Sequence, residues 1–179
     1  MTRIVLCCLF LLLAACGEQT SSAPPPPDAM NAEAIGRYCG MALGDHTGPK
    51  GQIKVKGLSE VFWFSSARDT LAFTLLPEEP KDIAAIYVTA MDKAKSWDRP
   101  GDESWVDART AVYVAGSNAT GGMGQREVVP FSSARAAEAF RIEHGGQVYA
   151  FDKVPREMVL GDDTPAGQRP GETTHGSHQ

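Results

Sequence analysis

One segment of the sequence occurs twice, and this duplication limits what the chain can fold into. Residues 61–73 (VFWFSSARDTLAF) and 128–140 (VVPFSSARAAEAF) are identical at eight of thirteen positions, at a constant offset of 67 residues. The match includes an unbroken Phe-Ser-Ser-Ala-Arg. It continues at Tyr87 and Tyr149 with an offset of 62, so the second copy is five residues shorter there. We therefore expect two tandem copies of one supersecondary unit.

Each copy predicts a β-β-α-β unit. A short apolar strand ends in Ser-Ser, whose hydroxyls can accept hydrogen bonds from the first free amides of a helix. The first copy is expected to have strands at 52–55, 60–64 and 83–88 and a helix at 67–75. The second is expected to have strands at 106–115, 127–131 and 147–151 and a helix at 134–143. The predicted fold class is α+β, with two β-β-α-β units related by internal duplication and largely antiparallel strands.

The N-terminus has the features of an export signal. Arg3 precedes an apolar run over residues 4–15 that is too short to span a membrane as a helix. Leu13-Ala14-Ala15-Cys16 has the form of a bacterial lipobox, in which the cysteine becomes lipid-modified and begins the mature chain. The next residue is Gly17 rather than the acidic residue associated with inner-membrane retention, which favours the outer membrane. We expect a lipid-anchored protein of the bacterial cell envelope that faces the periplasm.

Composition completes the division of the chain. Residues 17–28 are polar and proline-rich, as in a semi-extended tether, and residues after 160 lack any apolar period. The expected segments are a signal peptide (1–15), the lipidated cysteine and tether (16–32), the first unit with its Cys-x-Met loop (33–90), a linker (91–104), the second unit (105–159) and a disordered tail (160–179).

Charge and cysteine content exclude two classes of protein. Without residues 1–15 the chain has 16 basic and 22 acidic side chains, a formal charge of −6, and no sustained basic patch for nucleic acid. Cys39 is the single cysteine after Cys16, so a disulfide framework within the monomer is excluded.

Cys39 lies in a glycine-rich segment with Met41 and His46 close by. A free thiol in an exported protein is exposed to oxidation, so its retention needs a reason. Thiolate, thioether and imidazole form a soft ligand set, which favours Cu(I). A structural zinc site usually needs four Cys or His ligands, and the expected folded part has Cys39, His46 and His144 alone. Spacing alone leaves an alternative to metal binding, in which Cys39 is a loop cysteine without a functional role.

Met123 stands in a second glycine-rich loop, Thr120-Gly-Gly-Met-Gly. Methionine normally fills gaps in cores, so this position is unusual. Under the repeat, the loop corresponds in place to the Cys39 loop of the first copy. The two loops could face each other across the pseudo-twofold and share one ligand; the alternative is a loop methionine without a role.

Together these residues resemble the NosL family, copper lipoproteins that accompany nitrous-oxide reductase. The resemblance covers about residues 16–155 and rests on the following motifs: Cys39-Gly-Met41, Leu43-x-Asp45-His46-x-Gly48-Pro49-x-Gly51-Gln52-Ile53, Gly-Gly-Met123, and Val129-Pro130-Phe131-Ser132 with the helix that reaches Phe140. It implies a Cu(I) chaperone rather than an enzyme. The chaperone would deliver copper for assembly of the copper sites of nitrous-oxide reductase, together with an associated ABC-type transporter. It also implies a duplicated β-β-α-β fold shared with part of organomercurial lyase, and copper ligands among Cys39, Met123, Met41 and His46, with the choice among them open.

Two other hypotheses come from different classes. Cys39 could be the nucleophile of a thiol-dependent enzyme with His46 or His144 as base, although organomercurial cleavage needs a cysteine pair. The chain could also be a lipid-tethered interaction module without a metal site. His175 and His178 near the C-terminus could form a weak second metal-binding tail or an ordinary solvated one.

Overall fold

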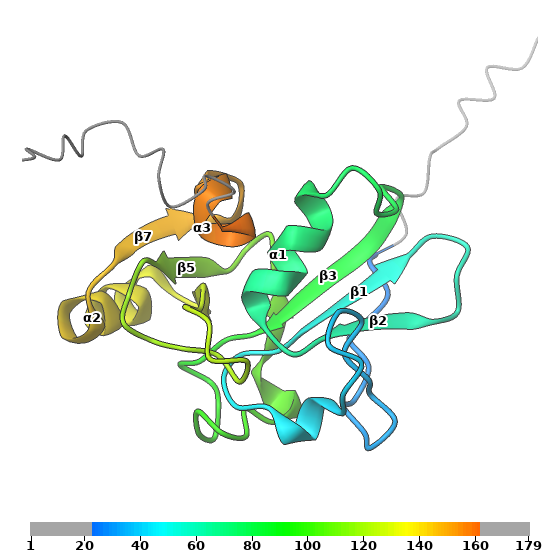
Figure 1. The fold of residues 1–179 in the computed structure, drawn as a ribbon, viewed down its shortest axis with the longest axis horizontal. Helices are drawn as coiled ribbons and strands as arrows, with labels where there is room; N and C mark the ends of the chain where they lie inside the picture. Colours follow the sequence, from blue (N-terminus) through cyan, green and yellow to red (C-terminus); the bar gives the residue numbers. More distant parts are fainter. Residues whose placement is uncertain (1–22, 162–179) are drawn as a thin grey trace, which may run out of the picture.

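The structure, a computed structural model, describes residues 23–161. The expected signal peptide, Cys16, His175 and His178 lie outside the described residues. Within them, the chain forms two antiparallel sheets and three α-helices (Figure 1). No helix in this part of the chain combines the length and apolar composition that crossing a membrane requires.

The three strands of each unit are arranged in the same order. The first sheet has the order β2-β1-β3-β4 and the second β6-β5-β7, so the first strand of each unit lies between the other two, and β4 is an additional edge strand. The strands are β1 (Gly51–Val55), β2 (Val61–Phe64), β3 (Ile83–Thr89), β4 (Trp105–Asp107), β5 (Val112–Ala115), β6 (Val129–Phe131) and β7 (Gln147–Ala150). The helices are α1 (Ala67–Leu75), α2 (Ala134–His144) and α3 (Arg156–Leu160), with short 3-10 turns η1 (Leu43–Asp45), η2 (Asp102–Ser104) and η3 (Phe151–Lys153).

The Ser-Ser pairs cap the two longer helices, as the sequence predicts. The Ser66 side chain accepts a hydrogen bond from the Asp69 amide, and Ser133 accepts one from the Ala136 amide. The predicted α+β fold of two β-β-α-β units is confirmed.

The prediction of one strand over 106–115 is wrong, because a turn divides it. The Asp107 carboxylate accepts a hydrogen bond from the Arg109 amide at 2.8 Å, and the Asp107 carbonyl accepts from Thr110 and Ala111. Asp favours such local turns over a strand ladder. As a result β4 pairs with β3 and extends the first sheet, whereas β5 is the central strand of the second.

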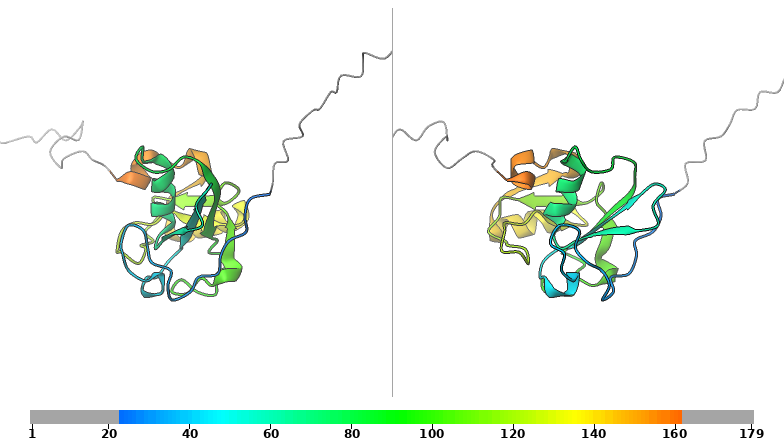
Figure 2. Two further views of the ribbon diagram at one scale, coloured as in Figure 1. Left: turned by 90° about the vertical axis from the view of Figure 1, so that its right-hand side faces the viewer. Right: turned by 45° about the vertical axis from the view of Figure 1, so that its right-hand side comes forward.

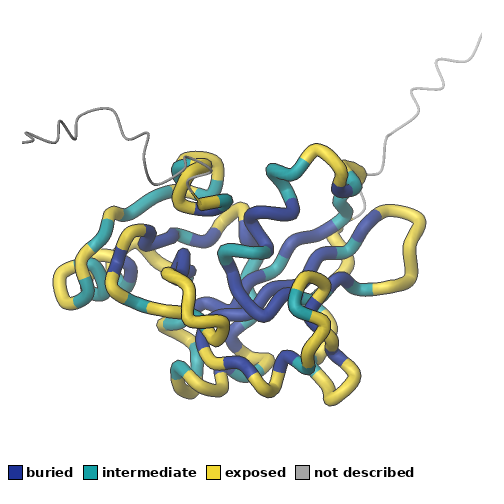
Figure 3. The backbone as a smooth tube through the Cα atoms, in the orientation of Figure 1, coloured by how far each residue is buried: buried dark blue, intermediate teal, exposed yellow. Residues whose placement is uncertain are grey.

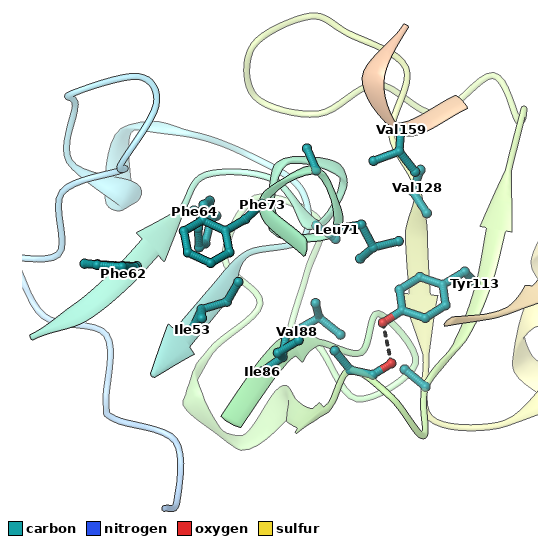
Figure 4. Packing of buried hydrophobic residues seen from close by; sticks show 14 of the residues in the cluster. Ile53, Phe62, Phe64, Leu71, Phe73, Ile86, Val88, Tyr113, Val128 and Val159 are labelled. Carbon is teal, nitrogen blue, oxygen red and sulfur yellow. Dashed lines mark hydrogen bonds between the residues drawn. The ribbon is translucent and has the colours of Figure 1, made fainter. Parts of the chain in front are cut away.

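A large hydrophobic cluster joins the two units, and a second, smaller cluster of Val114, Val129, Phe131 and Ala137 lies within the second unit. Helix α1 lies between the sheets (Figure 1), and the most deeply buried backbone gathers around it (Figure 3). Phe73 of α1 contacts Phe62 and Phe64 of β2, while Tyr113 of the second sheet belongs to the same cluster (Figure 4). Helix α3, which the sequence did not predict, packs against α1 and buries Val159 in this cluster.

Residues 25–30, here called the strap, lie on the face of the first sheet that points away from α1. Gln52 and Lys54 alternate with the core residue Ile53 and therefore project to this face. Gln52 bonds the Asp28 backbone, Lys54 donates to the Pro26 carbonyl and the Asp28 carboxylate at 2.6 Å, and Tyr87 donates to the Pro25 carbonyl. Figure 2 shows the strap beside the strands. This part of the expected tether is thus held against the folded body.

Candidate metal centre

Cys39 lies at the tip of a tight turn, residues 34–43, here called the Cys39 turn. The Gly36 amide donates to the Met41 carbonyl at 2.8 Å, and the Gly40 amide donates to the Gly36 carbonyl at 2.8 Å. Gly40 has a φ of +66°, which favours glycine. The Arg37 amide donates to the Trp63 carbonyl of β2 at 2.8 Å and so attaches the turn to the first sheet.

The Cys39 thiol meets the His46 imidazole. Cys39 Sγ lies 3.7 Å from His46 Nε2, and Cys39 is partly exposed whereas His46 is buried. For zinc, a neighbouring first-row ion, bonds to sulfur and imidazole nitrogen are about 2.3 and about 2.0 Å. Two donors 3.7 Å apart can therefore contact one metal ion without rearrangement.

Gly36 makes room for this thiol. A Cβ atom at residue 36 would lie 2.5 Å from Cys39 Sγ, which is closer than packed atoms approach. The backbone of His46 is held by η1, since the His46 amide donates to the carbonyl of the fully buried Leu43. The turn therefore presents a reachable thiol against a buried imidazole.

Met41 and Met123 supply exposed thioethers. Met41 is 41% exposed, and Met123, at the tip of residues 117–127 (the Met123 loop), is 49% exposed. Inside the loop, the Gly121 amide donates to the Gln125 carbonyl and the Gly124 amide to the Gly121 carbonyl, both at 2.9 Å. A side chain that normally avoids water is displayed at the surface in both loops.

The Met123 loop packs on the segment that follows the Cys39 turn. That the two glycine-rich loops share one ligand stays a prediction. A Cβ atom at Gly122 would lie 2.6 Å from His46 Cβ, and one at Gly48 would lie 3.4 Å from Gly121 Cα. The Met123 loop is therefore packed directly on the segment that carries His46, at the junction of the two units. Only glycines allow the backbones to approach so closely.

Two buried charged residues, which the sequence did not single out, support these loops. The Glu127 Oε1 atom accepts hydrogen bonds from the Arg68 and Val128 amides at 2.9 Å and from the Ser66 hydroxyl at 3.3 Å. Burial raises the pKa of Glu127 to about 7. Lys50 donates to the carbonyls of Thr47 and Gly48, and burial lowers the pKa of Lys50 to about 8. Glu127 thus fastens the Met123 loop to the N-terminus of α1, and Lys50 stiffens the segment after His46.

His46 also borders a cavity of about 280 Å³, which Met30, Leu43 and residues 95–103 help to line. His144, the alternative base, stacks on Phe140 with ring centroids 4.2 Å apart and is not the histidine that meets Cys39.

Within residues 23–161, no three His, Cys, Asp or Glu side chains lie close enough together to hold a metal ion. Any further donor to a metal at Cys39 and His46 would therefore be of another type, such as a thioether.

Comparisons with known proteins point to one family. The model of the NosL family matches residues 27–159. The chain is 46% identical over 132 residues to the copper-binding lipoprotein NosL of Achromobacter cycloclastes, which covers 73% of this chain and 68% of that protein. It is 33% identical over 122 residues to the copper-binding lipoprotein NosL of Stutzerimonas stutzeri, covering 68% of this chain and 62% of that protein. The crystal structure of the copper chaperone NosL from Shewanella denitrificans superposes with a TM-score of 0.68 at 35% identity, covering 74% of this chain and 98% of that one.

Proposed function

The chain belongs to the NosL family, and from this premise we propose that it is a Cu(I) chaperone that delivers copper for assembly of the copper sites of nitrous-oxide reductase. Relatives named copper-binding lipoproteins and a copper chaperone of the same fold support the proposal. An associated ABC-type transporter would be a further partner. Lipid on Cys16 would anchor the protein to the cell envelope, facing the periplasm and, by its lipobox context, in the outer membrane.

The observation that carries the proposal is the contact between Cys39 Sγ and His46 Nε2 at 3.7 Å, with the Met123 loop packed on His46. We assign Cys39 and His46 as copper ligands, completed by thioethers from Met41 and Met123. A thiolate with thioethers and an imidazole suits a soft monovalent ion.

The exposure of the two thioethers would allow copper to be released as well as bound. Met41 and Met123 lie at the surface, whereas His46 is buried. An incoming ligand from a partner can therefore displace one thioether at a time while Cys39 and His46 still hold the ion. Because the bound form of Cys39 is the thiolate, binding releases a proton and weakens as the pH falls.

The cysteine–histidine contact would also suit a thiol nucleophile with a histidine base. The exposed thioethers of Met41 and Met123 favour copper, because a thioether offers an enzyme neither a proton nor a polar contact. The two functions separate experimentally, since Met123→Leu should weaken Cu(I) binding and leave the alkylation rate of Cys39 unchanged.

Competition with a chromogenic Cu(I) chelator tests the proposal. We expect Cys39→Ala to abolish tight Cu(I) binding while circular dichroism stays that of the wild type, because the thiol is partly exposed and outside the core. Met123→Leu should weaken binding, and Met158→Leu should not. Met158 is the matched control because it is an exposed methionine on α3. Unchanged affinity in Cys39→Ala would refute the assignment of Cys39.

A further inference from the structure

We propose that Arg37 and Glu79 are positioning residues that hold the Cys39 turn in its copper-binding conformation. The inference rests on the proposed function, because it assigns these two residues to the same site. Neither residue contributes a soft donor atom. Their effect comes through the two residues that directly precede Cys39.

Glu79 gathers three donors from the Cys39 turn. Arg37 Nη2 donates to Glu79 Oε2 at 2.8 Å and Arg37 Nε donates to Oε1 at 3.3 Å, and the Tyr38 hydroxyl donates to Oε1 at 3.0 Å. Glu79 is 8% exposed. A buried carboxylate is costly unless it is paired and hydrogen-bonded. Burial of Glu79 therefore favours the conformation in which Arg37 and Tyr38 both donate to it.

Aromatic rings of the core fix the same two side chains. The Arg37 guanidinium lies 4.0 Å from the centroid of the Phe62 ring and 5.4 Å from that of Phe73. The Tyr38 ring packs edge-on against Phe64 at 5.5 Å. Residues 37 and 38 therefore contact β2 and α1 in the buried core of the first unit.

Apart from these side chains, the turn is held by its own backbone hydrogen bonds and by the Arg37 amide on the Trp63 carbonyl. Tyr38, Gly40 and Met41 are exposed, and glycines stand on both sides of Cys39. Such a segment would sample many conformations if it were released, and copper binding would have to order it. The Arg37–Glu79 pair keeps it ordered before copper arrives, as partners behind metal ligands commonly do.

The test compares Cu(I) affinity in the full chain by chelator competition. We expect Arg37→Ala and Glu79→Gln to weaken Cu(I) binding by about 10- to 100-fold. Arg37→Lys should restore part of the affinity, because lysine keeps the charge but not the two-pronged contact. In metal-free protein, the same variants should speed alkylation of Cys39 by iodoacetamide, since a released turn exposes the thiol more often.

Two controls separate positioning from stability. Arg141→Ala removes another two-pronged Arg–Glu pair, Arg141 with Glu138 on α2, which has no bond to the Cys39 turn, and should leave affinity unchanged. Val159→Ala destabilises the core away from the turn and should also leave affinity unchanged. If Arg37→Ala does not fold, Glu79→Gln, which preserves the side-chain volume, carries the test.

The outcomes distinguish this inference from the proposed function. The inference would be overturned if Arg37→Ala and Glu79→Gln fold and keep both the wild-type Cu(I) affinity and the wild-type alkylation rate. An equal loss of affinity in Val159→Ala would overturn it too, because stability alone would then explain the effect. A wild-type chain without Cu(I) affinity would instead refute the proposed function, and the alkylation rates would still decide whether the pair orders the turn.

Discussion

At residue 36, the absence of a side chain decides where the Cys39 thiol lies. Gly36 has ordinary backbone angles, so the reason for glycine there is space rather than conformation: a Cβ would come within 2.5 Å of the sulfur. The sequence shows Gly36 and Cys39 three residues apart, but the fold of the turn is what brings them together.

Gly36→Ala should therefore displace the thiol from His46 and weaken Cu(I) binding by about tenfold. Gly44→Ala is the matched control, because a Cβ at residue 44 would meet no atom within 4 Å. Chelator competition on both variants measures the effect. Equal affinities for the two would show that the thiol does not need this position.

Glu127 gives the stability a predictable pH dependence. Burial raises the pKa of Glu127 from 4.5 to about 7, so the folded state keeps a proton that the unfolded chain releases. This contribution to stability is complete below pH 4.5 and is lost as the pH rises to about 7, a loss of roughly 1 to 3 kcal/mol.

Glu127→Gln keeps an acceptor for the three hydrogen bonds and cannot ionise, so its unfolding free energy should be flatter across this pH range. Glu60→Gln is the control, because Glu60 occupies the equivalent place in the first copy and is exposed. Urea unfolding at several pH values checks the prediction, and parallel pH curves for wild type and Glu127→Gln would contradict it.

Single residues show why the site could be predicted only in part. Cys39, Met41 and His46 lie within eight residues of one another, so their proximity is visible in the sequence. Glu60 and Glu127 are equivalent in the repeat, yet only Glu127 is buried, and no local pattern distinguishes them. Their difference arises from packing between the units.

Among the elements, α1 has the central role, because its two ends support the two loops of the site. Its N-terminus binds Glu127 below the Met123 loop, and Glu79, shortly after its C-terminus, binds the Cys39 turn. The equivalent helix α2 is largely exposed, with Ala137 as its one buried residue. The duplicated helices therefore have the same caps and different roles.

This difference predicts unequal costs for the same substitution. Ser66→Ala should lower the unfolding free energy by about 1 to 2 kcal/mol, because Ser66 is buried and also bonds Glu127. Ser133→Ala should cost about 0.5 to 1 kcal/mol, because Ser133 is an exposed cap. Urea denaturation of both variants measures the two costs, and equal losses would contradict the role given to α1.

The elements that could be predicted are those with local signals. The Ser-Ser caps locate α1 and α2, and the repeat gives the order of the elements along the chain. The split between β4 and β5 and the presence of α3 depend on partners distant in sequence: β4 is held by β3, and α3 by α1. Apolar alternation alone runs across the Asp107 turn and gives no sign of it.

At the scale of the whole molecule, the larger hydrophobic cluster contains residues of both units. Val159, near the end of the described chain, packs in the same cluster as Ile53 and Phe73 of the first unit. The units should therefore unfold together rather than in sequence.

Val159→Ala tests this cooperativity. It should lower the unfolding free energy by about 1 to 3 kcal/mol, through lost burial and a small cavity. The third tryptophan, Trp97, packs against the second unit, so the test uses a Trp97→Phe background in which Trp63 and Trp105 of the first sheet remain. There, the midpoint seen by tryptophan fluorescence should fall together with that seen by circular dichroism. A fluorescence midpoint that stays in place while the other falls would show that the units are independent.

The strap also sets how far the protein can act from its anchor. Pro25 is bound to Tyr87, and nine residue steps separate it from Cys16, a span of at most about 30 Å. With lipid on Cys16, the strap would stay within this distance of the bilayer surface. Encounters with a membrane-bound acceptor would then occur at a high effective concentration. An acceptor whose copper site lies farther from the bilayer could receive copper only if that site moved closer to the membrane. The length of the segment between Cys16 and Pro25 would therefore help to select the partner.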